Sequence, residues 1–152
     1  PEAVKRIYDI KKRADNKSML VLLDDAGKIA SYADVPDIAL DLIEVADKPT
    51  TIIYPGAKRL APNLIAEDGT IGIRITREEF TRSLIFRYNK PIVSTSANIS
   101  GEPSPHFFGE ISEEIKNAVD YIVDYRRNDH KPAAPSSIIK LGMGGEIQII
   151  RK

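Results

Sequence analysis

The sequence predicts an α/β fold, with a mixed β-sheet flanked by helices in one domain over residues 1–152. Short apolar runs rich in isoleucine and valine alternate with longer segments of helical periodicity, which is the pattern of such folds. A chain of 152 residues of which 42% are hydrophobic can bury one sizeable core. Several apolar runs end in small polar side chains, and in an open α/β sheet the ends of the strands are where ligands bind.

Helices are expected where apolar residues recur every three to four positions. The first covers 2–12, with Ala3, Ile7 and Ile10 on one face and Pro1 suited to its start. The further expected helices cover 24–32, 36–45, 78–88 and 111–119. The expected strands cover 19–23, 49–54, 70–75, 91–93, 121–124, 138–139 and 147–150. The segments 58–68 and 125–134 are polar or irregular and are expected to be loops.

Composition excludes several classes of protein. There is no cysteine, and the two histidines, His106 and His130, are too few and too isolated for a zinc site. No apolar run reaches membrane-spanning length and no signal peptide is visible, so we expect a cytoplasmic protein without a membrane partner. The 22 basic and 22 acidic residues cancel, which argues against tight nucleic-acid binding and leaves weak RNA contact open.

The stretch 90–105 is the strongest candidate for a binding site. A short β-branched run at 91–93 is followed by hydroxyl and amide side chains, and Gly101 and two prolines then close a loop. The polar residues are Ser94, Thr95, Ser96, Asn98 and Ser100. They can donate hydrogen bonds to the oxygens of a ligand, or they can satisfy the backbone of a tight turn. The chain has no Walker A loop and no G-x-G-x-x-G motif, so a nucleotide would bind by another device.

Five further residues in three parts of the sequence are candidates. Lys11 and Arg13 lie at the C-terminal end of the first helix, where they complement its dipole or, if the chain becomes extended, converge on one anion. We expect both side chains to face solvent. Arg74 lies within an apolar strand, so it pairs with an acidic residue or binds the carboxylate or phosphate of a substrate. Ser136 and Ser137 place two hydroxyls at the start of another strand.

Five stretches of the sequence carry a family resemblance, the fourth of them in two parts. They are IYDIKKR at 7–13, PTT at 49–51, TIGIR at 70–74, STSANISG at 94–101, PSP at 103–105 and PSSII at 135–139. Together they resemble the YrdC/YciO family of threonylcarbamoyl-adenylate synthases. The stretches follow the order of the family and span almost the whole chain, and this agreement in order makes the signal specific.

The resemblance implies a twisted sheet with a concave, positively lined cavity. It implies an enzyme, a nucleotidyltransferase, that condenses L-threonine, bicarbonate and ATP into threonylcarbamoyl-AMP and pyrophosphate for the threonylcarbamoyladenosine modification of tRNA. It further implies partner enzymes that carry the threonylcarbamoyl group to tRNA. Mg²⁺ would enter with ATP, because the sequence shows no carboxylate cluster to hold a metal without the phosphates.

The resemblance also implies roles for individual residues. The lysine and arginine of its K-x-R motif and the serine and asparagine of its S-x-N motif would be catalytic, and these are Lys11, Arg13, Ser96 and Asn98. The same four residues would bind ATP together with Thr51, Ser94, Ser136 and Ser137. The threonine substrate would be bound by Arg74 and Ser136.

Two departures from the family pattern stand out. The family has an N-terminal strand and a Pro-Thr-Asp-Thr-like loop before the first matched helix, and this sequence starts at Pro1, so we expect an upstream segment. Lys17-Ser18-Met19 replaces the usual Lys-Pro-Leu and indicates a drift toward the YciO branch.

Three rival interpretations remain open at this point. The chain could be a double-stranded RNA or tRNA binding module, or a carbamoyl-adenylate enzyme with another acceptor, as in hydrogenase maturation. It could also be a regulatory nucleotide binder without catalysis.

Overall fold

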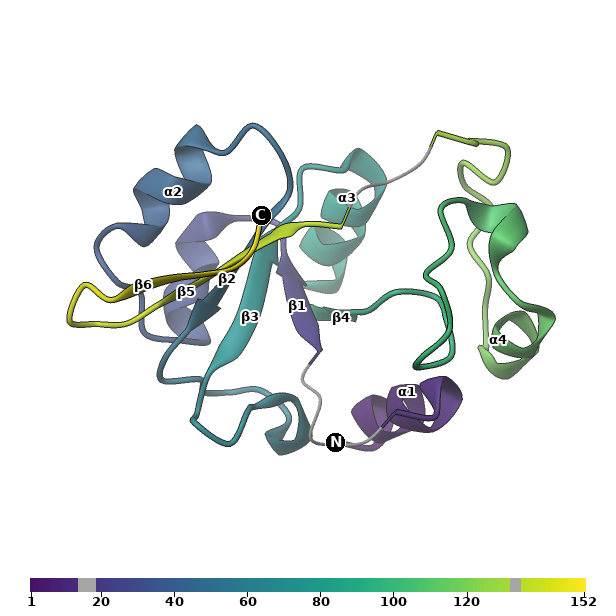
Figure 1. Ribbon diagram of the computed structural model, residues 1–152, viewed down its shortest axis with the longest axis horizontal. Helices are drawn as coiled ribbons and strands as arrows, with labels where there is room; N and C mark the ends of the chain where they lie inside the picture. Colours follow the sequence, from purple (N-terminus) through teal and green to yellow (C-terminus); the bar gives the residue numbers. More distant parts are fainter. Residues whose placement is uncertain (14–18, 132–134) are drawn as a thin grey trace.

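The computed structural model describes residues 1–13, 19–131 and 135–152 (Figure 1). Its helices are α1 Glu2–Lys11, α2 Ala39–Val45, α3 Glu79–Tyr88 and α4 Glu113–Ala118, with short 3-10 helices η1 Ala26–Ser31, η2 Pro62–Leu64 and η3 Phe108–Glu110. Its strands are β1 Leu20–Leu23, β2 Thr50–Tyr54, β3 Ile71–Ile75, β4 Ile92–Ser94, β5 Ser137–Leu141 and β6 Ile147–Arg151. The expected departure at Lys17-Ser18 lies outside the described residues, as does the end of the loop expected at 125–134.

The six strands form one sheet in the order β4-β1-β3-β2-β5-β6. The β1–β3 and β2–β5 pairs are parallel, and the other three pairs are antiparallel. The predicted mixed α/β sheet is therefore confirmed.

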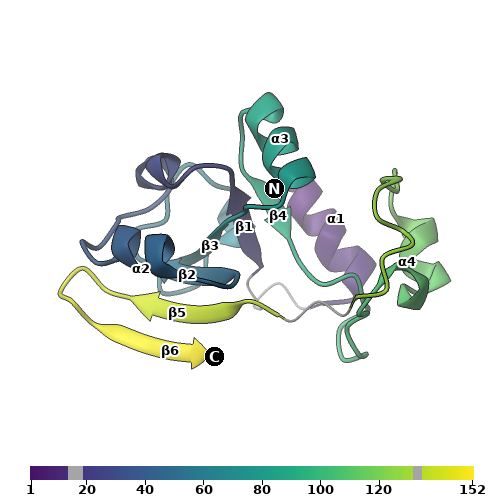
Figure 2. The same cartoon turned by 90° about the horizontal axis from the view of Figure 1, so that it is seen from above.

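One face of the sheet carries the hydrophobic core. Side chains alternate between faces along a strand, so Leu23, Ile52 and Ile73 share the face that packs against η1 and α2. From those helices Ile29 and Ala39 enter the same core, and both are fully buried. Figure 2 shows α2 and α3 on the same side of the sheet. The opposite face, which we call the open face, contributes no residue to this core.

The register shows which residues share the open face. Arg74 of β3 lies between Leu22 of β1 and Thr51 of β2. Ser94 of β4 is paired with Leu20 of β1, two residues before Leu22 and therefore on the same face. The polar residues predicted from three different sequence stretches thus reach one surface.

Helix α1 lies at one end of the sheet and ends with a left-handed residue. Val4 and Tyr8 are buried in the core, and the Tyr8 hydroxyl donates to the carbonyl oxygen of Asn63 at 3.2 Å. Lys12 has a φ of 51°, and its N–H donates to the Asp9 carbonyl oxygen at 3.2 Å. This left-handed cap ends the helix one residue earlier than predicted and redirects the chain before Arg13.

The strand predicted at 121–124 is wrong. These residues are irregular and pair with no strand among the described residues. The guanidinium of Arg127 donates instead to the carbonyl oxygens of Ile122 and Val123, at 2.8 and 3.1 Å. Tyr121 is 78% exposed, so the apolar residues that predicted a buried strand lie on the surface.

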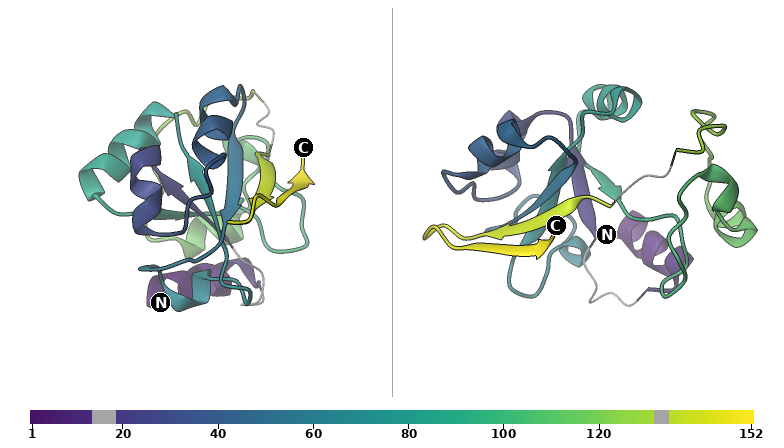
Figure 3. Two further views of the ribbon diagram at one scale, coloured as in Figure 1. Left: turned by 90° about the vertical axis from the view of Figure 1, so that its left-hand side faces the viewer. Right: turned by 45° about the horizontal axis from the view of Figure 1, so that its top comes forward.

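This segment and α4 stand to one side of the sheet, next to α1 (Figure 3). Arg6 of α1 makes a bidentate ion pair with Asp120, with both N···O distances 2.7 Å. Lys12 pairs with Glu114 of α4 at 2.7 Å. All four side chains are largely exposed, and exposed ion pairs contribute little to stability. No described helix is both long and apolar enough to cross a membrane.

Candidate functional site

Three of the predicted residues meet in the middle of the open face. The hydroxyls of Thr51 and Ser136 are 2.8 Å apart, and the two residues are only 2% and 4% exposed. Arg74 lies directly opposite Thr51, where cross-strand Cβ atoms are about 5 Å apart. Gly72 keeps this surface open, because a Cβ there would meet the Thr51 methyl group at 3.4 Å. The result is an arginine on the same face of the sheet as two buried hydroxyls.

Arg74 is half-buried and has no carboxylate partner among the described residues. Burial alone lowers its pKa from the ordinary value, because desolvation disfavours the charged form. Of the two explanations for an arginine on this strand, acidic pairing finds no support in the described part of the chain. Arg74 is therefore a candidate for binding an anionic ligand.

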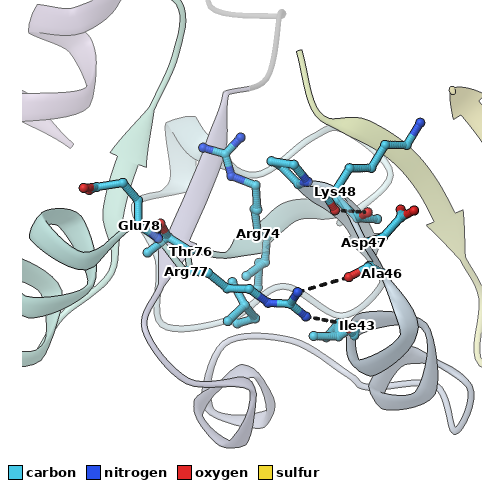
Figure 4. A pocket seen from close by; sticks show the side chains of 12 residues that line it. Ile43, Ala46, Asp47, Lys48, Arg74, Thr76, Arg77 and Glu78 are labelled. Carbon is cyan, nitrogen blue, oxygen red and sulfur yellow. Dashed lines mark hydrogen bonds between the residues drawn. The ribbon is translucent and has the colours of Figure 1, made fainter. Parts of the chain in front are cut away.

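A cavity of about 360 Å³ borders Arg74 between α2, the start of β2 and the start of α3. It is lined by apolar residues of the core face and by charged residues at its rim (Figure 4). Arg77 lies across it and donates to the carbonyl oxygens of Ala46 and Ile43 at 3.0 and 2.9 Å, which satisfies the C-terminal end of α2. Figure 4 shows the Arg74 guanidinium pointing away from Arg77, so the two arginines serve different surroundings.

A second group joins Lys11 to the Ser96–Asn98 loop. The Lys11 ammonium donates to the carbonyl oxygens of Ser96 at 2.6 Å and of Asn98 at 2.9 Å, and to Asn98 Oδ1 at 3.4 Å. Lys11 is only 3% exposed, so the expectation that it faces solvent is wrong. Burial lowers its pKa, and the nearby charge of Arg13 lowers it further.

Asn98 is engaged on both sides of its amide. Its Oδ1 accepts from the Ser96 hydroxyl and from Lys11, while its Nδ2 donates to the carbonyl oxygens of Glu102 at 2.8 Å and Ile99 at 3.2 Å. These contacts fix the conformation of the loop around Asn98. Ser96 is exposed, whereas Asn98 is half-buried.

The remaining predicted residues lie in different places. Arg13 is half-buried beside Lys11, and Ser94 lies on the open face at the end of β4. Ser94 and Arg74 are separated by β1, hence by about 10 Å across the sheet at about 4.8 Å per strand. Ser137 pairs with Thr50 and lies on the opposite face from Thr51, so Ser136 alone of the two serines adjoins Arg74.

Arg151 is a residue at this site that the sequence did not reveal. Its Nε donates to the Ser136 carbonyl oxygen at 2.8 Å, across the β5–β6 pair. Strand pairing could have indicated it, but an irregularity between Ile138 and Ile139 shifts the register so that Ile138 faces Arg151. Such a shift has no clear signature in the sequence.

The described residues contain no group of three His, Cys, Asp or Glu side chains that could hold a metal ion. The donors of the site are instead a guanidinium, an ammonium and hydroxyls, which suit the oxygens of carboxylates and phosphates. An open-faced α/β sheet with these donors suits the binding of an anionic ligand.

A family model identifies the class. The Sua5/YciO/YrdC model, described as "Telomere recombination", matches residues 1–152, and the chain belongs to this family. A protein of Methanocaldococcus jannaschii provisionally named threonylcarbamoyl-AMP synthase is 39% identical over 141 residues, covering 92% of this chain and 65% of that protein. The threonylcarbamoyl-AMP synthase of Pseudoalteromonas translucida is 28% identical over 150 residues, covering 96% of this chain and 79% of that protein.

Solved structures agree on the fold. P. abyssi Sua5 complexed with L-threonine is 25% identical with a TM-score of 0.79, covering 92% of this chain and 41% of that one. E. coli YciO has a TM-score of 0.81 at 22% identity, covering 99% of this chain and 73% of that one. HypF in its phosphate- and nucleotide-bound form has a TM-score of 0.82 at 26% identity, covering 99% of this chain and 23% of that one. The chain thus spans less than two thirds of the length of several relatives.

Proposed function

We propose that this chain is the catalytic part of an L-threonylcarbamoyladenylate synthase, a nucleotidyltransferase that forms threonylcarbamoyl-AMP from L-threonine, bicarbonate and ATP. The observation that carries the proposal is Arg74, which is half-buried beside Thr51 and Ser136 and has no acidic partner among the described residues. The names of the relatives and the threonine complex of P. abyssi Sua5 support it.

The reaction needs charge neutralisation more than acid–base chemistry. The threonine amine and bicarbonate first give a carbamate and water. A carbamate oxygen then attacks the α-phosphorus of ATP, and the bond from that phosphorus to the bridging oxygen breaks, which releases pyrophosphate. Because both reactants are anions, the protein contributes mainly by holding them in line and by placing positive charge around them.

Arg74 would bind the threonine carboxylate through two parallel N–H···O bonds. Ser136 would add a hydroxyl to the same carboxylate, with Thr51 holding its side chain in place. Arg13 and the Ser94–Asn98 region would receive the triphosphate. Mg²⁺ would arrive with ATP and neutralise the departing pyrophosphate. Ser137, on the core face of β5, would support the strand and would not contact the nucleotide.

Pyrophosphate release from Mg-ATP tests the proposal directly. We expect release only when L-threonine and bicarbonate are both present, with threonylcarbamoyl-AMP as the product seen by chromatography. Release that is independent of threonine would favour a carbamoyl-adenylate enzyme with another acceptor, as the similarity to HypF would allow. Failure to release pyrophosphate under any condition, while ATP still binds, would contradict synthase activity.

The product is a mixed anhydride, so it must be consumed by an enzyme that transfers the threonylcarbamoyl group. We infer that tRNA-modifying partner enzymes take it up and that the protein works in the cytoplasm. Addition of a tRNA substrate with such an enzyme should move radiolabelled threonine into tRNA.

A further inference from the structure

The Lys11 ammonium is fully engaged by the Ser96–Asn98 loop. An ammonium has three N–H donors, and here three oxygens of one loop receive them, two carbonyls and the Asn98 side chain. At 3% exposure it has no open side toward solvent. A phosphate could bind Lys11 only by displacing one of these oxygens.

From this geometry we infer that Lys11 is a positioning residue that builds the Ser96–Asn98 loop before any nucleotide arrives. Arg13 is then the cation of the K-x-R motif that meets phosphate. The inference rests on the proposed function for the identity of the ligand, whereas the positioning role itself concerns the ligand-free chain.

The contacts of Lys11 with two carbonyl oxygens also fix the direction of the neighbouring main-chain N–H groups. The chain has no cis peptide bond in its described part, and in a trans peptide the N–H points opposite to the C=O. Because the carbonyl oxygens of Ser96 and Asn98 face Lys11, the N–H groups of Ala97 and Ile99 face away from it. Neither N–H donates to any described residue. Among the described residues these two main-chain donors have no acceptor, an arrangement found in anion-binding loops.

Backbone contacts tie the same loop to the end of α1. The Ser100 N–H donates to the Lys11 carbonyl oxygen at 2.8 Å, and the Glu102 N–H donates to the Ile99 carbonyl oxygen at 3.0 Å. Lys11 thus holds the loop through both its main chain and its side chain. The amides of Ser100 and Glu102 report on the order of the loop without any ligand.

Hydrogen exchange of the nucleotide-free chain separates positioning from phosphate binding. The test variant is Lys11→Met, which keeps the length of the side chain and removes its donors. The matched control is Lys12→Met, which removes the neighbouring, exposed lysine that pairs with Glu114. In Lys11→Met we expect exchange at Ser100 and Glu102 to accelerate at least about tenfold, with β3 amides unchanged, because a charged hydrogen-bond donor has been lost. The control should leave these rates within about twofold.

A second pair of readouts uses the proposed reaction. Lys11→Met should lower kcat more than it raises KM for ATP, because the loop is disordered in every complex, whereas Arg13→Met should mainly raise KM for ATP. Normal exchange rates in ligand-free Lys11→Met, combined with a loss of ATP-induced protection, would overturn the positioning role. If the chain made no adenylate at all, the proposed function would fail. The exchange rates of the nucleotide-free chain would still test the positioning role of Lys11.

The native chain offers a test that needs no variant. Protons of a buried ammonium with three acceptors exchange slowly, so the Lys11 ammonium should give an NMR signal without nucleotide that persists when Mg-ATP is added. A signal that arises only after Mg-ATP is added would show that phosphate, and not the loop, holds Lys11.

Discussion

Replacing Arg74 with methionine should stabilise the chain while impairing its activity. Arg74 is half-buried between Leu22 and Thr51, and its charge has no acidic partner in the described part of the chain. Methionine fills similar space without a charge to desolvate. We expect a gain of about 0.5–1 kcal/mol in the free energy of unfolding. For a chain of this length that corresponds to a rise of about 1–4 °C in Tm.

The expected loss of activity follows from the carboxylate contact. A hydrogen bond between charged groups contributes about 1.5–3 kcal/mol, and each 1.36 kcal/mol is tenfold, so kcat/KM for threonine should fall about 10- to 150-fold. KM for ATP should change little, because Ser94, which precedes the Ser96–Asn98 loop, is about two strand spacings away. Pyrophosphate release at varied threonine, together with thermal unfolding with and without threonine, measures both effects.

Arg77→Met is the matched control. Arg77 lies three residues further along the chain and donates to the carbonyl oxygens of Ala46 and Ile43. Its loss should lower the free energy of unfolding by about 1 kcal/mol and leave KM for threonine unchanged. The reasoning about Arg74 would be refuted if Arg74→Met destabilised the chain as Arg77→Met does, or if its KM for threonine equalled that of the native chain.

Three further predictions concern buried polar groups and pH. Thr51→Val and Ser136→Ala each leave a buried hydroxyl without its partner and should cost about 1–3 kcal/mol, while the double variant should cost about 1 kcal/mol less than the sum, as measured by urea unfolding. If the cost of the double variant equalled the sum of the two single costs, the 2.8 Å contact would contribute nothing to stability. The Tyr54 hydroxyl is buried without a hydrogen-bond partner among the described residues, and burial raises its pKa, so Tyr54→Phe should leave Tm unchanged or raise it. Tyr8→Phe, which loses a bond to Asn63, should lower Tm and serves as the comparison. The Lys140 ammonium and the Thr70 hydroxyl lower the pKa of Asp68 to about 2, so its stabilising effect is present above pH 4 and lost as the pH falls from 4 to 2. Asp68→Asn should therefore cost about 0.2–1 kcal/mol at pH 7, because this pair is half-exposed, and the difference should vanish near pH 2.

The sheet could be predicted because its signals are local. Ile71, Ile73 and Ile75 alternate with smaller or polar residues along β3, and every predicted strand except one was found. The exception at 121–124 had the same apolar character, yet Arg127 takes the carbonyl oxygens that a neighbouring strand would have bound. A side-chain donor four or five residues away leaves no mark in hydrophobic periodicity.

The sequence indicated which candidate residues lie together, but it did not indicate how they are arranged. Motif matches indicated Lys11, Ser96 and Asn98, and the structure brings these three together. Sequence reasoning placed Lys11 in solvent, because a charged residue at a helix end is usually exposed, and could not foresee that Lys12 would adopt a left-handed conformation. Which residue of an adjacent pair faces the ligand, as with Ser136 and Ser137, depends on strand register.

The parallel pairing of β2 with β5 has a consequence for how the chain folds. Thr51 and Ser136 touch although 85 residues separate them, so their contact closes one of the longest loops in the molecule. Contacts of such sequence separation form slowly, and during synthesis β5 and β6 are made after every other strand of the sheet. The part of the proposed site that would bind threonine is therefore completed only when the β5–β6 hairpin docks beside β2. Threonine binding should therefore report on that step of folding.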